Sequence, residues 1–359
     1  MRLLALARQQ GSPAGRLRAE VPRWWRGEAE GALWSGASVA LAPAEALYRL
    51  AVATRNALYA SGLRRSRRVG APVVSVGNLA VGGTGKTPFA RWVAEQLEAR
   101  GARVAILHGG YAPDEPALHR AWRPGSLVIA MRDRVAAAQI AIEQGATALV
   151  LDDGFQHRRL HRDLDLVLVA AESWWARERL LPRGQWREPR TALARAGAVV
   201  VTRKTASEAA ARRVALEAST LAPHAVVARV HLRPSGWRVR GSAQRAGPTG
   251  KVVAVCGVAE PEHFFANACE AGADIAEKLV FGDHHAYTAG DLERIAEVAG
   301  GRPVVTTAKD AVKLRDLDAE LELWVLDQDV VVEEGGGALS AALDALLDRQ
   351  AAPEGGGAH

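Results

Sequence analysis

The feature that most constrains this 359-residue chain is a glycine-rich loop between an apolar run and a helix-like segment. The apolar run is Pro72-Val-Val-Ser-Val76, and the loop reads Gly77-Asn-Leu-Ala-Val-Gly-Gly-Thr-Gly-Lys-Thr87. A loop that joins a strand to a helix N-terminus turns backbone N–H groups toward an anion, and a Lys-Thr pair adds a cation and a hydroxyl for Mg²⁺. We therefore predict a phosphate-binding loop, made of Ala80, Val81, Gly82, Gly83, Thr84, Gly85, Lys86 and Thr87. A glycine-rich turn without a ligand is the alternative.

Lysine is rare in this chain, which makes each lysine informative. The sequence has 46 lysines and arginines, and only six of them are lysines, at positions 86, 204, 251, 278, 309 and 313. Where arginine is the default cation, a lysine is more readily explained by a chemical requirement. Lys86 of the glycine-rich loop is the first lysine of the chain.

Composition and charge narrow the class of protein. Hydrophobic residues make up 48% of the sequence and charged residues 24%, which is typical of a globular chain and excludes wholesale disorder. Cys256 and Cys269 are too few for a disulfide framework or a four-thiolate zinc site. The net charge of +6 fits nucleic acid, anionic lipid or a phosphorylated substrate. We expect no secretory signal at the N-terminus and no membrane-spanning segment.

Strand-like and helix-like runs alternate along most of the chain, which predicts an α/β fold with a parallel sheet. The first set of runs has strands at 72–76, 104–107, 127–130, 149–151, 166–169 and 198–202 and helices at 88–99 and 133–144. A second set begins at Lys251 and has strands at 252–255, 278–281, 304–306 and 323–325 and helices at 262–271 and 289–298. Two alternating runs around Pro234-Ser-Gly236 separate the sets and predict a β-hairpin.

These runs divide the chain into five expected segments. They are an N-terminal helical segment at 1–68, a phosphate-loop domain at 69–224, a β-hairpin linker at 225–248, a smaller second α/β domain at 249–332, and a C-terminal helix with a flexible tail at 333–359. Residues 33–60 give the apolar pattern of the N-terminal helix, with a break near Pro43.

Two acidic residues follow a buried strand in Leu149-Val-Leu-Asp-Asp-Gly-Phe-Gln-His157. In a parallel sheet this strand end lies near the phosphate loop, where hydrated Mg²⁺ needs carboxylate partners. Adjacent residues of a strand point in opposite directions, so we expect Asp152 and Asp153 to do different work. An acidic turn that caps the next segment is the alternative.

Three further motifs carry polar side chains. Leu180-Leu-Pro-Arg-Gly-Gln-Trp-Arg-Glu-Pro189 offers Arg183 and Arg187 to phosphate oxygens and Glu188 to a metal. Phe281-Gly-Asp-His-His-Ala-Tyr287 suggests a metal ligand or a general base, against ordinary solvated histidines. Thr306-Thr-Ala-Lys-Asp-Ala-Val-Lys-Leu314 places Lys309 and Lys313 on one helix face, where salt bridging is the plain alternative.

Taken together, these motifs resemble the tetraacyldisaccharide 4′-kinase family. Its members share a GNLxxGGxGKTP loop, a strand ending in DDG(F/L)QH, an LLPxGxxREP segment, a DHH-type motif and TTxKDAVKL, and the same order occurs here between Trp24 and Leu326. The resemblance implies a two-domain P-loop NTPase-type fold joined by a β-ribbon. It implies ATP and Mg²⁺ as cofactors, and transfer of the γ-phosphate to the 4′-hydroxyl of a tetraacyldisaccharide 1-phosphate at the cytoplasmic face of the inner membrane.

The resemblance also assigns roles to individual residues. It makes Ala80–Thr87 the ATP-binding loop and pairs Asp114 with His284 across the two domains to activate the sugar hydroxyl. The expected catalytic residues are His284, Asp114, Lys86, Arg134 and Arg187, and the expected metal-side residues are Thr87, Asp152, Asp153 and Glu188. Two departures stand out: the family's SRGYGG-like stretch reads Leu107-His-Gly-Gly-Tyr-Ala112 here, and the loop that follows it is short.

A four-chain lipid acceptor implies that the enzyme binds a membrane surface. We expect the segment 33–68 to do so, as a peripheral attachment to anionic lipid. The apolar side chains offered to the bilayer are Leu33, Trp34, Val39, Leu41, Leu47, Leu50 and Leu58, and the cations offered to head groups are Arg49, Arg55, Arg64, Arg65, Arg67 and Arg68. A helix packed on the sheet is the alternative.

Two other functions compete with the kinase prediction. The first is a P-loop NTPase of the metallochaperone or nucleotide-switch type, which would need no DHH motif in a second domain. The second is a basic nucleic-acid-binding protein, although the sequence has no zinc knuckle or aromatic RNA-binding signature. We expect no nucleic-acid partner, and the sequence leaves the oligomeric state open.

Overall fold

The computed structural model describes residues 13–29, 31–111, 113–239, 244–245, 247–314 and 321–351. The predictions of no secretory signal and of a flexible tail concern residues 1–12 and 352–359, which lie outside the described residues.

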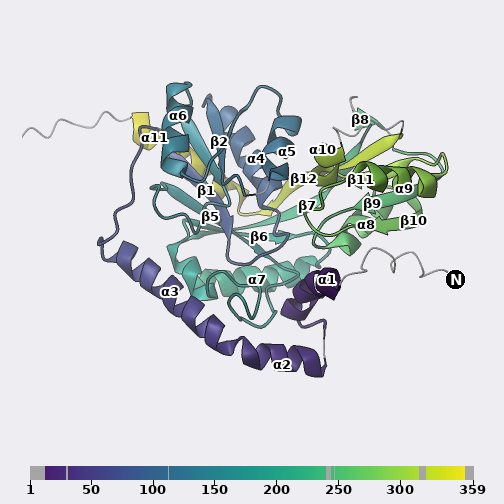
Figure 1. Ribbon diagram of the computed structural model, residues 1–359. Helices are drawn as coiled ribbons and strands as arrows, with labels where there is room; N and C mark the ends of the chain where they lie inside the picture. The colour runs from purple at the N-terminus through teal and green to yellow at the C-terminus, as the bar shows by residue number, and fades with distance from the viewer. Residues whose placement is uncertain are drawn as a thin grey trace, which may run out of the picture.

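One continuous sheet of 12 strands runs through both α/β units, in the order β10-β9-β11-β12-β7-β6-β5-β1-β4-β2-β3, with β8 paired to β7. In Figure 1 the first unit lies to the left and the second to the right, with β7 and β12 passing between them. The strands of the first unit are β1 (Val73–Asn78), β2 (Val104–His108), β3 (Leu127–Ala130), β4 (Ala148–Asp152), β5 (Leu164–Ala170) and β6 (Ala198–Arg203). Those of the second are β9 (Lys251–Cys256), β10 (Asp274–Val280) and β11 (Val304–Thr307).

Helices cover both faces of the first unit, so its central strands are buried on both sides. Strand β1 is buried along its whole length, as expected for a continuous apolar run in a parallel sheet. The helices of this unit are α4 (Lys86–Glu98), α5 (Asp114–Trp122), α6 (Arg134–Glu143) and α7 (Glu208–Leu221), with a 3₁₀ turn, η2 (Arg190–Arg195). On α4, Phe89, Val93 and Leu97 recur at helical spacing and are fully buried.

The predicted hairpin at 225–240 is wrong, because these residues form one long strand, β7 (Val226–Val239). Its antiparallel partner is β12 (Leu323–Glu334), which is distant in the sequence. The Pro234-Ser-Gly236 segment is a bulge in β7: Pro234 faces Gln328 and Gly236 faces Asp327, so Ser235 is the extra residue. Gly236 has a φ of 138°, which an L side chain rarely adopts. The ribbon that joins the units is therefore β7 with β12, and β8 (Gln244–Arg245) adds a short pair to β7.

The C-terminal helix is present, but it is not a separate segment. Helix α11 (Gly336–Ala351) inserts Leu339, Leu343 and Leu346 into the same core as Phe89 of α4. The chain thus returns through β12 to finish the first unit. The helices α8 (Pro261–Glu270), α9 (Ala289–Ala299) and α10 (Ala308–Leu314) belong to the second unit.

The N-terminal segment is an outer arm of three helices, α1 (Pro13–Arg26), α2 (Ala32–Ala40) and α3 (Ala42–Ala60). The break near Pro43 is confirmed, because α2 and α3 meet there. Trp24 of α1 stacks on Trp34 of α2 with ring centroids 5.2 Å apart. In Figure 1, α2 and α3 run along the lower edge of the molecule.

Candidate active site

A cavity of about 320 Å³ lies between the phosphate loop and the second α/β unit. Its walls include the loop residues Val81 to Thr87, the start of α8, the Asp283–His284 segment and Thr307 to Lys309 at the start of α10. The loop connects β1, at the centre of the first unit, to α4. The carboxyl ends of parallel strands thus face the second unit, as is usual for ligand sites in open α/β sheets.

Glycine is required in the phosphate loop at Gly85, which caps the N-terminus of α4. Its φ is 83°, and a Cβ there would lie 2.0 Å from Cδ1 of Leu232 on β7. The loop is held in place by Asn78, whose amide donates to the Thr84 hydroxyl at 2.8 Å, and by Thr202, whose hydroxyl donates to the Thr84 carbonyl at 3.1 Å. These contacts fix the loop with its N–H groups at a helix N-terminus, which is the arrangement that binds phosphate.

Lys86 forms an ion pair with Asp153. Its Nζ lies 3.7 Å from Asp153 Oδ1, and Arg187 Nη1 donates to both oxygens of the same carboxylate at 2.7 and 2.8 Å. Burial alone would raise the pKa of Asp153, but the charges of Lys86 and Arg187 outweigh it and lower the pKa to about 2. Asp153 is therefore ionised and holds two cations at the mouth of the loop. Its φ of 58° is in the left-handed region, which is costly for a non-glycine residue.

Asp152 points the other way, as the strand alternation predicts. One oxygen lies 3.0 Å from Nε2 of His119, and the other, Oδ1, is buried without a hydrogen-bond partner among the described residues. Burial alone would raise the pKa of Asp152, but the hydrogen bond with His119 together with the charges of His119, His108 and Lys86 lowers the pKa. The fully buried carboxylate thus carries charge and has one oxygen left for a ligand.

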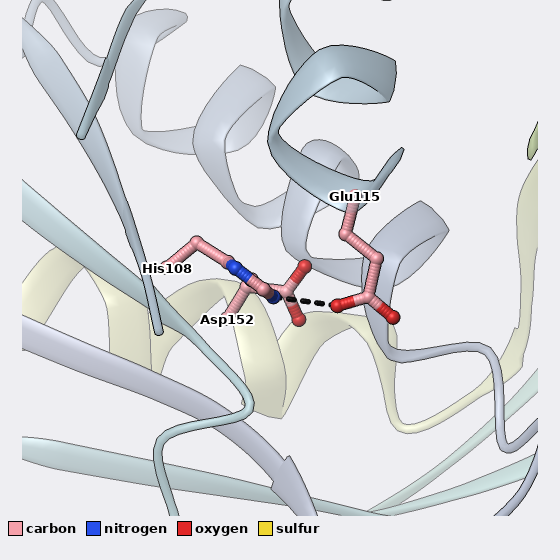
Figure 2. Close-up of side chains that lie close together, drawn as sticks. All are labelled: His108, Glu115 and Asp152. Carbon is pink, nitrogen blue, oxygen red and sulfur yellow. Dashed lines mark hydrogen bonds and ion pairs between the residues drawn. The ribbon is translucent and has the colours of Figure 1, made fainter. Parts of the chain in front are cut away.

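Asp152 belongs to a group that could hold a cation. One side-chain atom each of His108, Glu115 and Asp152 lies within 4.8 Å of the others. Figure 2 shows His108 and Glu115 joined at 2.5 Å, with the Asp152 carboxylate beside them. The backbone N–H of Gly110 donates to Nδ1 of His108, so Nε2 carries the hydrogen and donates to Glu115. In this tautomer His108 orients Glu115 and leaves cation binding to the carboxylates.

The oxygen donors at this strand end fit Mg²⁺. The unpaired oxygen of Asp152 is a buried carboxylate oxygen of the kind that hard divalent cations bind. Thr87, Glu115 and Asp153 line the cavity at the phosphate loop.

Glu188, which the motif offered to the metal, does not fit. It is completely buried, and its two oxygens contact Arg55 at 3.1 Å, Asn56 at 2.7 Å and Arg195 at 3.0 Å. Because all of these contacts saturate the carboxylate, Glu188 anchors α3 to the first unit. The phosphate contact expected of Arg183 is likewise replaced by an ion pair with Glu45 of α3 at 3.2 Å.

The structure brings Asp114 and His284 together across the two units. Nδ1 of His284 lies 3.0 Å from Asp114 Oδ2, and Lys309 Nζ lies 3.1 Å from Nε2 of the same ring. Asp114 is the first residue of α5, and the 170-residue separation of the pair is closed by the packing of α10 on α5. His284 has a φ of 57°, in the left-handed region that is costly for a non-glycine residue.

The charges around this pair favour an ionised carboxylate and a basic imidazole. Burial alone would raise the pKa of Asp114, but the hydrogen bond with His284 and the charge of Lys309 lower it to about 2. The hydrogen bond with Asp114 raises the pKa of His284 and outweighs the opposing effects of burial and Lys309. Because an ammonium can only donate, Lys309 requires a lone pair on Nε2, so Nδ1 carries the hydrogen toward Asp114.

Arg134 lies beneath the segment that departs from the family pattern. It is buried, and its Nη1 donates to the Met131 carbonyl at 2.9 Å. A Cβ at Gly109 would lie 2.5 Å from its Nη2. The absence of a side chain at Gly109 therefore leaves room for the Arg134 guanidinium.

Several site residues were missed at the sequence level. Lys309 contacts both members of the Asp114–His284 pair, and Lys204 pairs with Glu260 at 3.2 Å and contacts the Gly83 carbonyl of the phosphate loop. The scarcity of lysine could have pointed to both. Lys313 instead pairs with the buried Asp310 at 3.1 Å, so the two lysines of that motif do different work.

Replacing Gly77 with alanine is expected to destabilise the fold by about 1–3 kcal/mol through overpacking. A Cβ at Gly77 would lie 2.5 Å from Cβ and 2.7 Å from the backbone nitrogen of Phe155, in the turn that carries Asp152 and Asp153. Denaturant unfolding measures the loss. Gly36→Ala is the control, because nothing lies within 4 Å of a Cβ at Gly36. Equal stability of the two variants would contradict this close packing.

Comparison with known proteins places the chain in a family. The model of the family described as tetraacyldisaccharide-1-P 4′-kinase matches residues 37–114 and 112–348. The tetraacyldisaccharide 4′-kinase of Anaeromyxobacter sp. (strain K) is 44% identical, with 92% of this chain and 96% of the relative covered. That of Halorhodospira halophila is 38% identical, with 88% and 95% covered.

A solved structure agrees with the sequence matches. The LpxK of Aquifex aeolicus, crystallised in complex with ATP, has a TM-score of 0.68 and 26% identity, and the similarity covers 86% of this chain and 99% of that one. The two alternative functions receive no support. The P-loop NTPase-type fold is confirmed, and the chain belongs to the tetraacyldisaccharide-1-P 4′-kinase family of ATP-dependent phosphotransferases that act on a hydroxyl group.

Proposed function

We propose that the side chains around this cavity transfer the γ-phosphate of ATP to the 4′-hydroxyl of a tetraacyldisaccharide 1-phosphate. The observation that carries the proposal is the Asp114–His284 pair, which stands at the same cavity as the phosphate loop. A sugar hydroxyl is a weak nucleophile, so transfer needs a base close to the phosphates. A nucleotide-hydrolysing switch protein would have no use for a base supplied by a second domain.

In this proposal His284 takes the proton of the sugar hydroxyl at Nε2. Asp114 holds Nδ1–H, which fixes the ring and stabilises the positive charge that forms on it. Lys309 contacts Nε2 at 3.1 Å, so the acceptor hydroxyl would compete with this ammonium for the lone pair of Nε2. Lys309 then remains near both Asp114 and the incoming phosphate.

The phosphates of ATP would be held by the loop N–H groups and by Lys86. Their entry draws Lys86 from Asp153, since phosphate oxygens compete for the same ammonium. Thr87, Asp152 and Asp153 would hold Mg²⁺, which neutralises charge on the phosphate oxygens when it is bound. Arg187 lines the cavity beside Asp153. If Asp153 held the cation, Arg187 would be free to bind a phosphate oxygen.

The direct test of the acceptor uses two lipids. The protein is incubated with ATP and either a tetraacyldisaccharide 1-phosphate or the same lipid with hydrogen in place of the 4′-hydroxyl. Mass spectrometry should find one added phosphate group on the first lipid only. Phosphate added to neither lipid would contradict the proposed reaction, and phosphate added to both would contradict the proposed position.

We further propose that helices α2 and α3 of the N-terminal arm attach the enzyme to the cytoplasmic face of the inner membrane. In the described part of the chain, no helix has the length and apolarity to cross a bilayer. Four apolar side chains of the arm are nevertheless exposed by more than 60%: Leu33, Val39, Leu47 and Leu50. Each methylene inserted among acyl chains contributes about 0.8 kcal/mol, so a few such residues give reversible attachment.

The structure narrows the residues expected to contact lipid. Trp34 is buried against Trp24, and Arg55 is paired with Glu188, so neither is available to the membrane. The exposed cluster that follows α3, Arg64, Arg65, Arg67 and Arg68, remains suited to anionic head groups. Only Arg68 of this cluster has an ion pair with a described residue, Asp163 at 3.5 Å.

Replacing Leu47 and Leu50 with asparagine should reduce co-sedimentation with vesicles that contain anionic phospholipid. Replacing the four clustered arginines with glutamine should also reduce it, by about 1 kcal/mol per arginine, and added salt should weaken binding of the parent protein. Leu216→Asn is the matched control, since Leu216 on α7 is 69% exposed and lies outside the arm. Binding that ignores anionic lipid, or equal loss in the control, would contradict attachment through this arm.

A further inference from the structure

The cavity extends beyond the phosphate loop along one face of α8. Glu260 stands immediately before this helix and binds Lys204, which contacts the Gly83 carbonyl of the loop. His263, Phe264 and Asn267 follow at one-turn spacing and line the same cavity. Since each residue of a helix advances about 1.5 Å, Asn267 lies about 10 Å along the helix from Glu260. The cavity therefore has a phosphate end and an end at Asn267.

Asn267 is a buried amide with unused hydrogen-bonding capacity. Its side chain belongs to a residue that is 1% exposed, and Nδ2 has no partner within the described ranges of the chain. A buried amide group left without a partner costs about 1–3 kcal/mol. A ligand that accepts a hydrogen bond from Nδ2 would remove this cost.

The surroundings of Asn267 suit a flat apolar ring. Leu118 and Trp122 of α5 line the cavity from the first unit, and Phe264 of α8 and Leu326 of β12 line it from the second. The indole nitrogen of Trp122 is a second buried donor without a partner among the residues that are described. The end of the cavity away from the phosphates thus combines apolar walls with two unused donors, which is the usual composition of a small-molecule site.

We propose that Asn267 recognises the adenine base of ATP and makes the site selective for adenine over guanine. The inference rests on the proposed function, because the phosphate loop is taken to hold the phosphates of ATP. An asparagine amide can accept from the 6-amino group of adenine and donate to a neighbouring ring nitrogen. Guanine presents two acceptors at its major-groove edge, so the same amide can make only one of the two bonds.

The test measures nucleotide binding without any lipid acceptor. Calorimetric titrations compare ATP, GTP and inorganic tripolyphosphate for the parent protein, for Asn267→Leu and for the nearly isosteric Asn267→Asp. ATP affinity should fall about tenfold or more in both variants, which corresponds to about 1.4 kcal/mol of binding free energy. The preference for ATP over GTP should also become smaller. Tripolyphosphate affinity should stay within about twofold of the parent, which also shows that the phosphate loop is folded. Glu262→Gln is the control on the same helix, since the Glu262 side chain is 81% exposed.

The outcomes separate this inference from the kinase proposal. Unchanged ATP and GTP affinities in both variants would overturn the role of Asn267, while lipid phosphorylation could proceed as proposed. An equal loss for ATP, GTP and tripolyphosphate would assign Asn267 a structural role and would also overturn the inference. A selective loss of ATP binding would support it even if no lipid is phosphorylated, in which case the proposed reaction alone fails.

Discussion

Replacing Lys86 with alanine is expected to lower the rate of phosphoryl transfer at least about 10²-fold, because one stabiliser of the developing charge is lost. Lys86 lies at the start of α4 and is the one charged side chain among residues 80–87 of the phosphate loop. The fold should survive, since the described contact of the Lys86 ammonium is the 3.7 Å ion pair with Asp153. Initial rates of lipid phosphorylation give the effect, and circular dichroism checks the fold.

Lys251→Ala serves as the control for this prediction. Lys251 is exposed at the start of β9, and its replacement should leave the rate within about twofold of the parent, as is usual for surface substitutions. A folded Lys86→Ala variant with a rate near that of the parent would contradict the role of the phosphate loop.

Removing either Asp114 or His284 is expected to lower kcat by about 10²–10⁴-fold, the range for loss of general-base catalysis. The KM for ATP should change little. The pair contacts Lys309 and makes no contact with the phosphate loop among the described residues. The double variant Asp114→Asn/His284→Ala should have a kcat close to that of the less active single variant, because the effects of residues that act as a unit are not additive. Steady-state kinetics with both substrates measure these constants.

The pH dependence of this pair provides an independent readout. The base must be neutral, so kcat/KM should rise with pH through the pKa of His284, which Asp114 raises above its ordinary value. In Asp114→Asn that pKa falls, so the acidic limb of the profile should move to lower pH. His224→Ala, which removes an exposed histidine elsewhere, should change neither rate nor profile. Full additivity of the two variants, or an acidic limb that stays in place, would contradict the assigned pair.

The sequence predicts the first unit well because its elements are determined locally. The loop from Gly77 to Thr87 needs only the strand before it and the helix after it, and Asp152 and Asp153 follow from strand alternation. The ribbon could not be predicted in the same way. The run around Pro234-Ser-Gly236 has the composition of a turn, and only its pairing with the distant β12 shows it to be a bulge.

The site shows the same division between local and long-range information. The pairing of Asp114 with His284 came from a family resemblance and could not be read from spacing, because α5 and the second unit meet only in the folded chain. The motif at 180–189 predicts Glu188 as a metal-side carboxylate, whereas its burial between α3 and Arg195 depends on tertiary packing. Lys309 was within reach of sequence reasoning, since lysine is scarce, but its partners were not.

The central claim is that the second unit presents His284 to an acceptor hydroxyl at the phosphate loop. The most direct measurement follows the label of [γ-³²P]ATP into lipid and into inorganic phosphate, with and without a tetraacyldisaccharide 1-phosphate in mixed micelles. Label should enter the lipid when the acceptor is present, and release of inorganic phosphate should stay slow when it is absent. Release of inorganic phosphate at the same rate with and without acceptor, with no labelled lipid, would contradict it.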